Sequence, residues 1–371
     1  MGYQKQETTV YVKEQTAKGA IAVVGDADAI QITDKTTLVK PQAAEVESPV
    51  LRPRGSRLPP KKYAIGKWGI GDHGVIWHGS GTPGTPPEFG VLLKNLLGTE
   101  VTNAAGTVEA GSGAVGGFDS ALDLTVGQAV RVAIGAGYEI RLISGKSGSG
   151  TYTYTVDRDF AQAPADSAEI CAGVSYIIGT TDKWLTVDQY EDKNRYLASD
   201  VRCRSLKWSL GAKDIVAGVF GLKALTCEES DVPAGDPNNF VWDDRLPFVG
   251  ASCTMLIGGS SVNVKSLEFD IEVPKEVSYV NDNGLSDLPG DSNINASGTV
   301  VREMLGVSPL SAFFSGTLAD VVWQQTSSDG DIGFVQFSDV QNGRADAQDE
   351  DDDLQWSVPF TITGGICIGF F

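Results

Sequence analysis

Histidine, a common residue at catalytic and metal sites, occurs only twice in this chain. His73 and His78 both lie in the segment DHGVIWH. Two residues at this spacing on a strand point to opposite faces of a sheet. The spacing therefore predicts two separate strand histidines, at the surface or half-buried, that share neither a metal nor a catalytic site.

Fragments of nucleotide-binding motifs also occur, but each lacks its structural context. The segment GSGAVG at 111–116 fits G-x-G-x-x-G, yet no strongly apolar strand precedes it and no convincing helix follows, so we interpret it as a linker. Gly145-Lys146-Ser147 resembles the end of a P-loop, but Ile140 stands where its first glycine belongs. No G-x-S-x-G elbow occurs, and the acidic runs lack EF-hand spacing. We therefore expect no enzyme, metal site or cofactor.

Charge and cysteine usage exclude further classes. The chain has 371 residues, with 48 acidic and 29 basic side chains and a net charge of -19. This balance opposes binding to a nucleic-acid backbone or to an anionic membrane. The N-terminus has no apolar signal-peptide core, and no run is long enough for a membrane span. We expect buried, reduced thiols at Cys171, Cys203, Cys227, Cys253 and Cys367.

One short helix stands out in a chain whose many glycines (44) favour strands and turns. In TPPEFGVLLKNLLG, Thr85 is predicted to cap the helix, Pro86 to occupy its first position and Glu88 to complete a capping box. Gly98 is predicted to end it. One apolar face is formed by Phe89, Leu92, Leu93 and Leu96.

Three segments recur in the same order. A second capped helix is predicted at 308–316, with Phe313 and Phe314 on its apolar face. The segment SRLP at 56–59 is echoed by SDLP at 286–289, and LKWSL by LQWSV, which contain Trp208 and Trp356. The order suggests a tandem duplication, and chance similarity among short β-rich segments is the alternative.

The spacing of these segments suggests two domains, 1–245 and 246–371. From Thr85 to Leu206 is 121 residues, but from Ser308 to Leu354 is 46. The first domain is therefore predicted to have a β-rich surface insertion at about 100–198. Its N-terminal arm is predicted to continue into a long loop at 41–62, without periodicity.

Together these segments resemble the tail tube proteins of long-tailed bacteriophages of the non-contractile, siphovirus type. The resemblance rests on GSRLP at 55–59 in the long loop, the strand after it, the helix with LLxxLLG, and SLKWSL at 205–210. It is best over 45–100 and 200–320. The insertion and the acidic loop near residue 350 are outside it.

The resemblance implies a mainly β protein with β-sandwich or partial-barrel domains, each with one short flanking helix. Strands of neighbouring copies would pair and close a ring with six-fold symmetry of domains. Two domains per chain would give a ring of three chains, a trimeric pseudo-hexamer, and a single domain would require six. Trp208 and Trp356 are expected in the strand core or at an interface.

The resemblance also implies partners. Rings would stack head to tail into a tube, and the candidate ring-to-ring contact is the basic loop with Arg52, Arg54, Arg57, Lys61 and Lys62. DNA would pass through without specific binding because an acidic wall repels phosphates. The tape measure, terminator and tip proteins would meet the tube ends. The location implied is the virion tail, assembled in the host bacterial cytoplasm.

Two other classes stay open from the residues alone. A capsid decoration or tail terminator protein would share the virion but form no filament. A β-sandwich adhesin or carbohydrate-binding module could use some of the seven tryptophans and ten tyrosines for sugar stacking.

Overall fold

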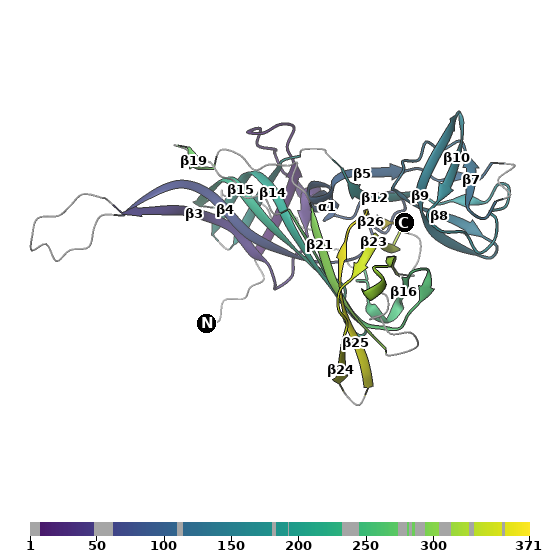
Figure 1. Cartoon of the computed structure of the whole chain (residues 1–371). Helices are drawn as coiled ribbons and strands as arrows, with labels where there is room; N and C mark the ends of the chain where they lie inside the picture. Colours follow the sequence, from purple (N-terminus) through teal and green to yellow (C-terminus); the bar gives the residue numbers. More distant parts are fainter. Residues whose placement is uncertain are drawn as a thin grey trace, which may run out of the picture.

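The chain is mainly β, as the sequence predicts (Figure 1). The computed structural model describes residues 8–47, 62–109, 114–179, 183–191, 193–231, 245–273, 280–281, 284–285, 294–303, 313–325, 330–350 and 353–371.

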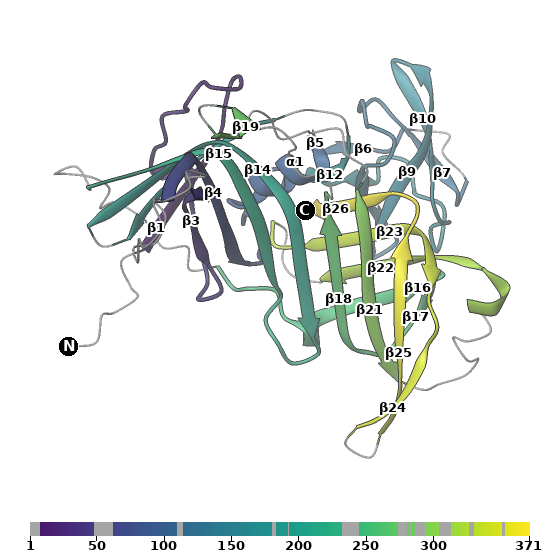
Figure 2. The ribbon, with the colours of Figure 1, turned by 60° about the vertical axis from the view of Figure 1, so that its left-hand side comes forward.

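Eight antiparallel strands form one continuous curved sheet, and most of them lie side by side across the front of Figure 2. In spatial order they are β3 (Thr37–Glu47), β4 (Lys62–Ile76), β15 (Ala217–Asp231), β14 (Asn194–Gly211), β18 (Val264–Glu272), β21 (Asn295–Glu303), β25 (Asp353–Ile362) and β24 (Asp346–Glu350). Alternation decides the faces. Along β14, Leu206, Trp208 and Leu210 are buried and Lys207 is exposed.

A second layer covers the apolar face of this sheet. One part pairs β2 (Ala29–Ile30), β1 (Thr8–Glu14) and β13 (Leu185–Glu191) with the first half of β14. The other part pairs β17 (Ser260–Ser261), β16 (Cys253–Ile257), β22 (Leu318–Gln325), β23 (Gly333–Asn342), β26 (Ile366–Phe370), β12 (Gly173–Ile178) and β5 (Gly98–Asn103). Between the layers lies an aromatic core that includes Trp77, Phe89, Trp208, Trp323 and Phe370.

The same pairing pattern occurs twice along the chain. In residues 253–371, the strands β18, β21, β25 and β24 take the places that β3, β4, β15 and β14 take in residues 8–231. In the second layer, β17, β16, β22 and β23 likewise take the places of β2, β1, β13 and the first half of β14. Pairing of β14 with β18 joins both series into one sheet.

The sequence echoes do not follow this pattern throughout. Trp208 lies on β14, whereas Trp356 lies on β25, which takes the place of β15. The match between LKWSL and LQWSV therefore pairs the wrong strands. Trp208 is fully buried, and Trp356 is half-buried against the same core. The segments 56–59 and 286–289 lie outside the described residues.

A smaller six-stranded sheet is inserted between β5 and β12. Its strands are β6 (Gly106–Thr107), β7 (Gly117–Ser120), β8 (Ala129–Ile134), β9 (Gly137–Ser149), β10 (Thr151–Val156) and β11 (Glu169–Ile170). It has its own core around Phe118, Val130 and Tyr154. The predicted insertion at 100–198 is too wide, because β5, β12, β13 and the start of β14 belong to the main sheets.

The helix α1 (Gly90–Leu97) begins later than predicted. Phe89 is its N-cap and supplies no side-chain hydrogen bond. Thr85 and Pro86 precede the helix, and the Glu88 carboxylate accepts the backbone N–H of Gln31 at 2.7 Å instead of closing a capping box. A tertiary hydrogen bond thus replaces the local one.

The end of the helix is where the sequence places it. Gly98 has φ = 95°, a conformation that favours glycine. A Cβ at this position would lie 2.5 Å from the carbonyl oxygen of Gly179, so the close approach of the two backbones also requires glycine.

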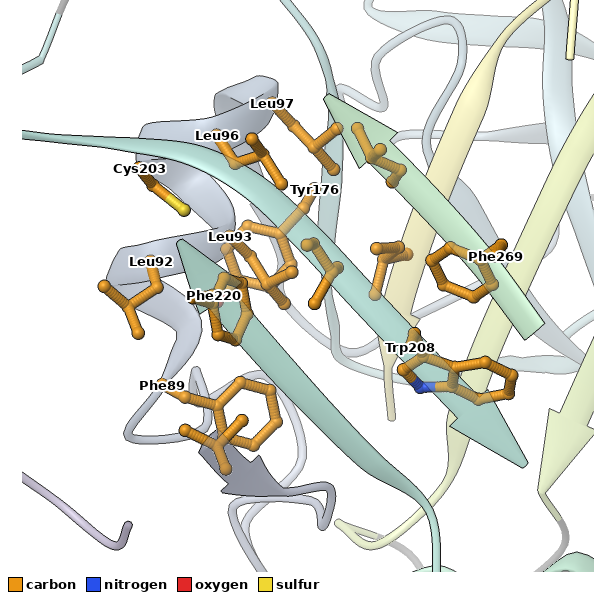
Figure 3. Close-up of a cluster of buried hydrophobic side chains, with 14 of the residues drawn as sticks. Phe89, Leu92, Leu93, Leu96, Leu97, Tyr176, Cys203, Trp208, Phe220 and Phe269 are labelled. Atoms are coloured by element: carbon orange, nitrogen blue, oxygen red, sulfur yellow. The ribbon is translucent and has the colours of Figure 1, made fainter. Parts of the chain in front are cut away.

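Helix α1 is buried on several sides. Its leucines point towards β14 and β15, where Cys203 and Phe220 lie (Figure 3). Phe89, Leu92, Leu93 and Leu96 are buried. The buried Asn95 links two further segments, because its Oδ1 accepts the Cys203 N–H at 2.7 Å and its Nδ2 donates to the Lys183 carbonyl at 2.8 Å.

The predicted second helix differs. Residues 313–315 are helical, while 304–312 lie outside the described residues. Phe314 is 80% exposed and Phe313 is 37% exposed. In the single chain these side chains do not pack into a core as α1 does, contrary to the prediction.

Three short elements lie outside the two large sheets and α1. They are the 3-10 helices η2 (Asp26–Asp28) and η3 (Gly250–Ser252), and a two-stranded ribbon of β19 (Val280–Asn281) and β20 (Gly284–Leu285).

We expect Asn95→Ala to lower the free energy of unfolding by about 1–3 kcal/mol, because the buried N–H of Cys203 would lose its acceptor. Urea unfolding of the monomer at neutral pH measures this. The matched control is Asn295→Ala, at an exposed strand position, with an expected change within about 0.5 kcal/mol. Equal effects of both substitutions would contradict the role assigned to Asn95.

Candidate functional site

The two histidines occupy separate positions, as predicted, but both are buried. His73 lies on β4 with Nε2 at 3.1 Å from Oε1 of Gln189 on β13. The same Oε1 accepts the N–H of Val39 at 2.8 Å, and the Gln189 Nε2 donates to the Val39 carbonyl at 3.1 Å. Because Oε1 is an acceptor, His73 carries its proton on Nε2. Burial lowers the pKa of His73 to about 4, and the Gln189 bond opposes that shift.

The side-chain amide of Gln189 holds the first part of β3 in place. Val39 lies where the β3–β4 register shifts, between Thr37 and Lys40. At such an irregularity a backbone N–H and C=O leave the ladder and require other partners. Gln189 supplies both, and the neutral His73 supports Gln189. His73 is thus a structural residue of the sheet.

His78 follows β4 and lies apart from His73. Its Nδ1 is 2.8 Å from the Gly79 carbonyl oxygen, and its Nε2 is 3.8 Å from the Glu88 carboxylate. Within the described ranges, no group of three or more His, Cys, Asp or Glu side chains could hold a metal. No helix in those ranges has the length and apolarity that a membrane crossing needs.

The polar face of the eight-stranded sheet is concave. A hollow of about 660 Å³ crosses five successive strands, from β15 through β14, β18 and β21 to β25. Its lining includes Lys207, Glu268, Ser297, Thr299 and Thr361. Because these residues alternate with buried core residues on the same strands, the hollow is the solvent-facing side of the curved sheet.

Acidic side chains predominate on this face. The alternating positions carry Asp72, Glu268, Asp270, Glu272, Glu303 and Asp346 against Lys40, Lys207 and Lys223, and Lys35 also lines the hollow. Burial raises the pKa of Asp270, and the Lys207 charge acts in the opposite direction. The face therefore has a net negative charge that repels polyanions.

The curved sheet ends in two open edges. Among the described residues, β3 pairs only with β4, and β24 pairs only with β25. Each edge presents unpaired backbone donors and acceptors, which is the usual template for strand addition. The sequence revealed neither edge, because local alternation does not show which strand lies outermost.

The ends of the predicted loop at 41–62 are strands instead. Its first part, up to Glu47, is the end of β3 and pairs with the start of β4, where Lys62 lies. Figure 1 shows this hairpin projecting from the body. The predicted contact residues Arg52, Arg54, Arg57 and Lys61 lie outside the described residues.

The structure combines a curved sheet with an acidic concave face, two open edges and a covered apolar side. A family model for the phage tail tube protein matches residues 5–363. The chain therefore belongs to the phage tail tube protein family and is a structural component of a phage tail. No curated protein matches it.

Acid should weaken the fold through His73. Its pKa is about 4 when folded and about 6.5 when unfolded, so the unfolded chain binds the proton more tightly. Protonation of His73 leaves the free energy of unfolding unchanged above pH 6.5. It lowers this free energy progressively as the pH falls to 4, by up to about 3 kcal/mol.

His73→Gln is the comparison for this prediction, since glutamine can still donate to Gln189 but does not titrate. Urea unfolding between pH 7 and pH 4 should show a smaller loss of stability in the variant than in the unsubstituted chain. Carboxylates titrate in both proteins and cancel in the difference. Parallel pH profiles would contradict the prediction.

Proposed function

We propose that this chain assembles with copies of itself into rings that stack into the tail tube, whose acidic channel conducts DNA. The proposal extends the family membership, and one observation carries it: a curved sheet has an acidic concave face and two open edges. Copies joined at these edges would turn the concave face into the wall of a closed barrel. Closure also removes the edges that otherwise aggregate.

Three chains per ring fit this architecture best. The repeated pairing pattern supports a tandem duplication with domains near 1–245 and 246–371. Each domain then contributes four strands to the wall, and three chains of eight strands give a 24-stranded barrel. The domains would be arranged with six-fold pseudo-symmetry. A non-contractile, siphovirus-type tail is the setting that the sequence resemblance supports.

The hairpin of β3 and β4 is the proposed contact between stacked rings. It projects from the body (Figure 1), and the connection between its strands contains Arg52, Arg54, Arg57 and Lys61. Basic residues there could meet the acidic surface of the next ring, in a chain of net charge -19. The tape measure, terminator and tip proteins are the proposed partners at the tube ends.

Electron microscopy of the purified protein, with light scattering of the same sample, tests the assembly. We expect stacked rings with a central channel and a ring mass of three chains. A ring mass of six chains would disprove the trimer and leave the tube intact. A protein that stays monomeric when concentrated would disprove self-assembly.

Charge reversal on the concave face tests the channel. In Glu268→Lys/Glu272→Lys, assembled tubes should retain short double-stranded DNA on co-sedimentation, with roughly tenfold less binding at 200 mM than at 50 mM salt. The control Asp123→Lys/Asp166→Lys places equal charge on the inserted 106–170 unit and should retain little DNA. Equal retention by both variants would argue against a channel wall at the concave face.

A further inference from the structure

Pairing of β14 with β18 forms the internal joint between the two four-stranded series. The same kind of pairing can cover the open edges. We propose that β24 of one chain pairs antiparallel with β3 of a second copy, in the arrangement that β14 and β18 adopt within the chain. The inference rests on the proposed ring assembly and names the strands and the direction of the contact between chains.

The repeated pairing pattern identifies the two strands. The last strand of the first series is β14, and it pairs with β18, the first strand of the second series. By position, β24 is the last strand of the second series and β3 is the first strand of the first. A contact of β24 with β3 therefore repeats the internal joint and extends the sheet without a change of curvature.

The internal joint also fixes the direction. Gly211, next to the β14–β15 turn, lies opposite Ser266 near the start of β18, and Ser205 lies opposite Glu272 at its end. The turn between β24 and β25 follows Glu350. The Glu350 end of β24 therefore faces the first half of β3, and Asp346 faces the part of β3 nearer to Glu47.

The two joints differ in chemistry. The internal joint has a stacked pair of Trp208 and Phe269, with ring centroids 4.8 Å apart, and Lys207 opposite Asp270. The sequence of β24 is DAQDE, without an aromatic or basic residue. The joint between chains therefore depends on ladder hydrogen bonds and charge, and should be the weaker of the two.

Charge fits this pairing at the Glu350 end of β24, which faces Lys40, and opposes it at the Asp346 end, which lies nearer to Glu45 and Glu47. The first half of β3 has Lys40 and follows Lys35, whereas the acidic residues of β3 are confined to its far end at Glu45 and Glu47. Lys40 forms an ion pair with Glu191 at 2.7 Å, and the Lys40 side chain remains 42% exposed. A second acidic residue can therefore approach it. Pro41 lacks an N–H, which is typical of an edge strand but offers no ladder hydrogen bond to β24.

Disulfide crosslinking in assembled rings tests the joint. The variants combine Ala347→Cys with Gln42→Cys or with Ala44→Cys, and the matched control combines it with Thr37→Cys. Gln42 and Ala44 lie in the part of β3 that the Asp346 end of β24, next to Ala347, should face, whereas Thr37 is about 16–23 Å away along an extended strand. A disulfide needs Cα atoms within about 7 Å. Single-cysteine variants control for random oxidation.

We expect at least one of the Gln42 and Ala44 variants to form covalent species that end at three chains on a non-reducing gel, and the Thr37 variant to form few. Rings without these crosslinks would overturn the joint and leave the proposed function standing. Crosslinking through Thr37 in their place would overturn its direction. Absence of rings from the unsubstituted chain would overturn the proposed function and, with it, the joint.

Discussion

The backbone pairing of the curved sheet is the constraint on which the rest of the molecule depends. A strand satisfies its backbone groups only with a neighbour on each side. All six strands from β4 to β25 in the spatial order have two such neighbours, and β3 and β24 have one. The body behind the sheet keeps one face apolar and dry, which fixes the other face as polar. The open edges therefore follow from the pairing order, and the polar side of the sheet follows from the burial of its other face.

Long strands connect the sheet to its covering layer. This connection differs between residues 8–231, the first half, and residues 253–371, the second half. In the first half, β14 passes from one layer to the other at a register shift between Cys203 and Ser205. The N–H of Cys203 is taken up by Asn95 of α1, so the helix stabilises the bend. In the second half, the same path is divided between β23 and β24, which are separated at 343–345.

The sequence predicted where the strands and the helix lie better than it predicted how they pair and pack. Alternation and glycine content correctly indicated strands, and the leucine spacing located α1. The capping box failed because Glu88 bonds to Gln31, which is distant in sequence and not detectable from local spacing. The insertion was too wide because two sequence distances cannot show that β5 and β12 belong to the main sheet. The Trp208 and Trp356 match failed because two strands of one hairpin share the same alternation. No local signal distinguishes an outer strand from an inner one, so the open edges were invisible.

Net charge links the fold to its proposed assembly. Closing a ring brings the acidic concave faces of several copies towards one axis, which opposes assembly. At physiological salt the Debye length is about 8 Å, so facing charges across a wide channel interact weakly. Charges at a strand joint lie within a few ångströms and are not screened in this way. Repulsion therefore acts mainly on a polyanion that enters the channel and brings phosphates near the wall, and much less on the ring itself. An acidic wall can repel DNA without preventing closure, provided that the joining edges carry opposite or few charges.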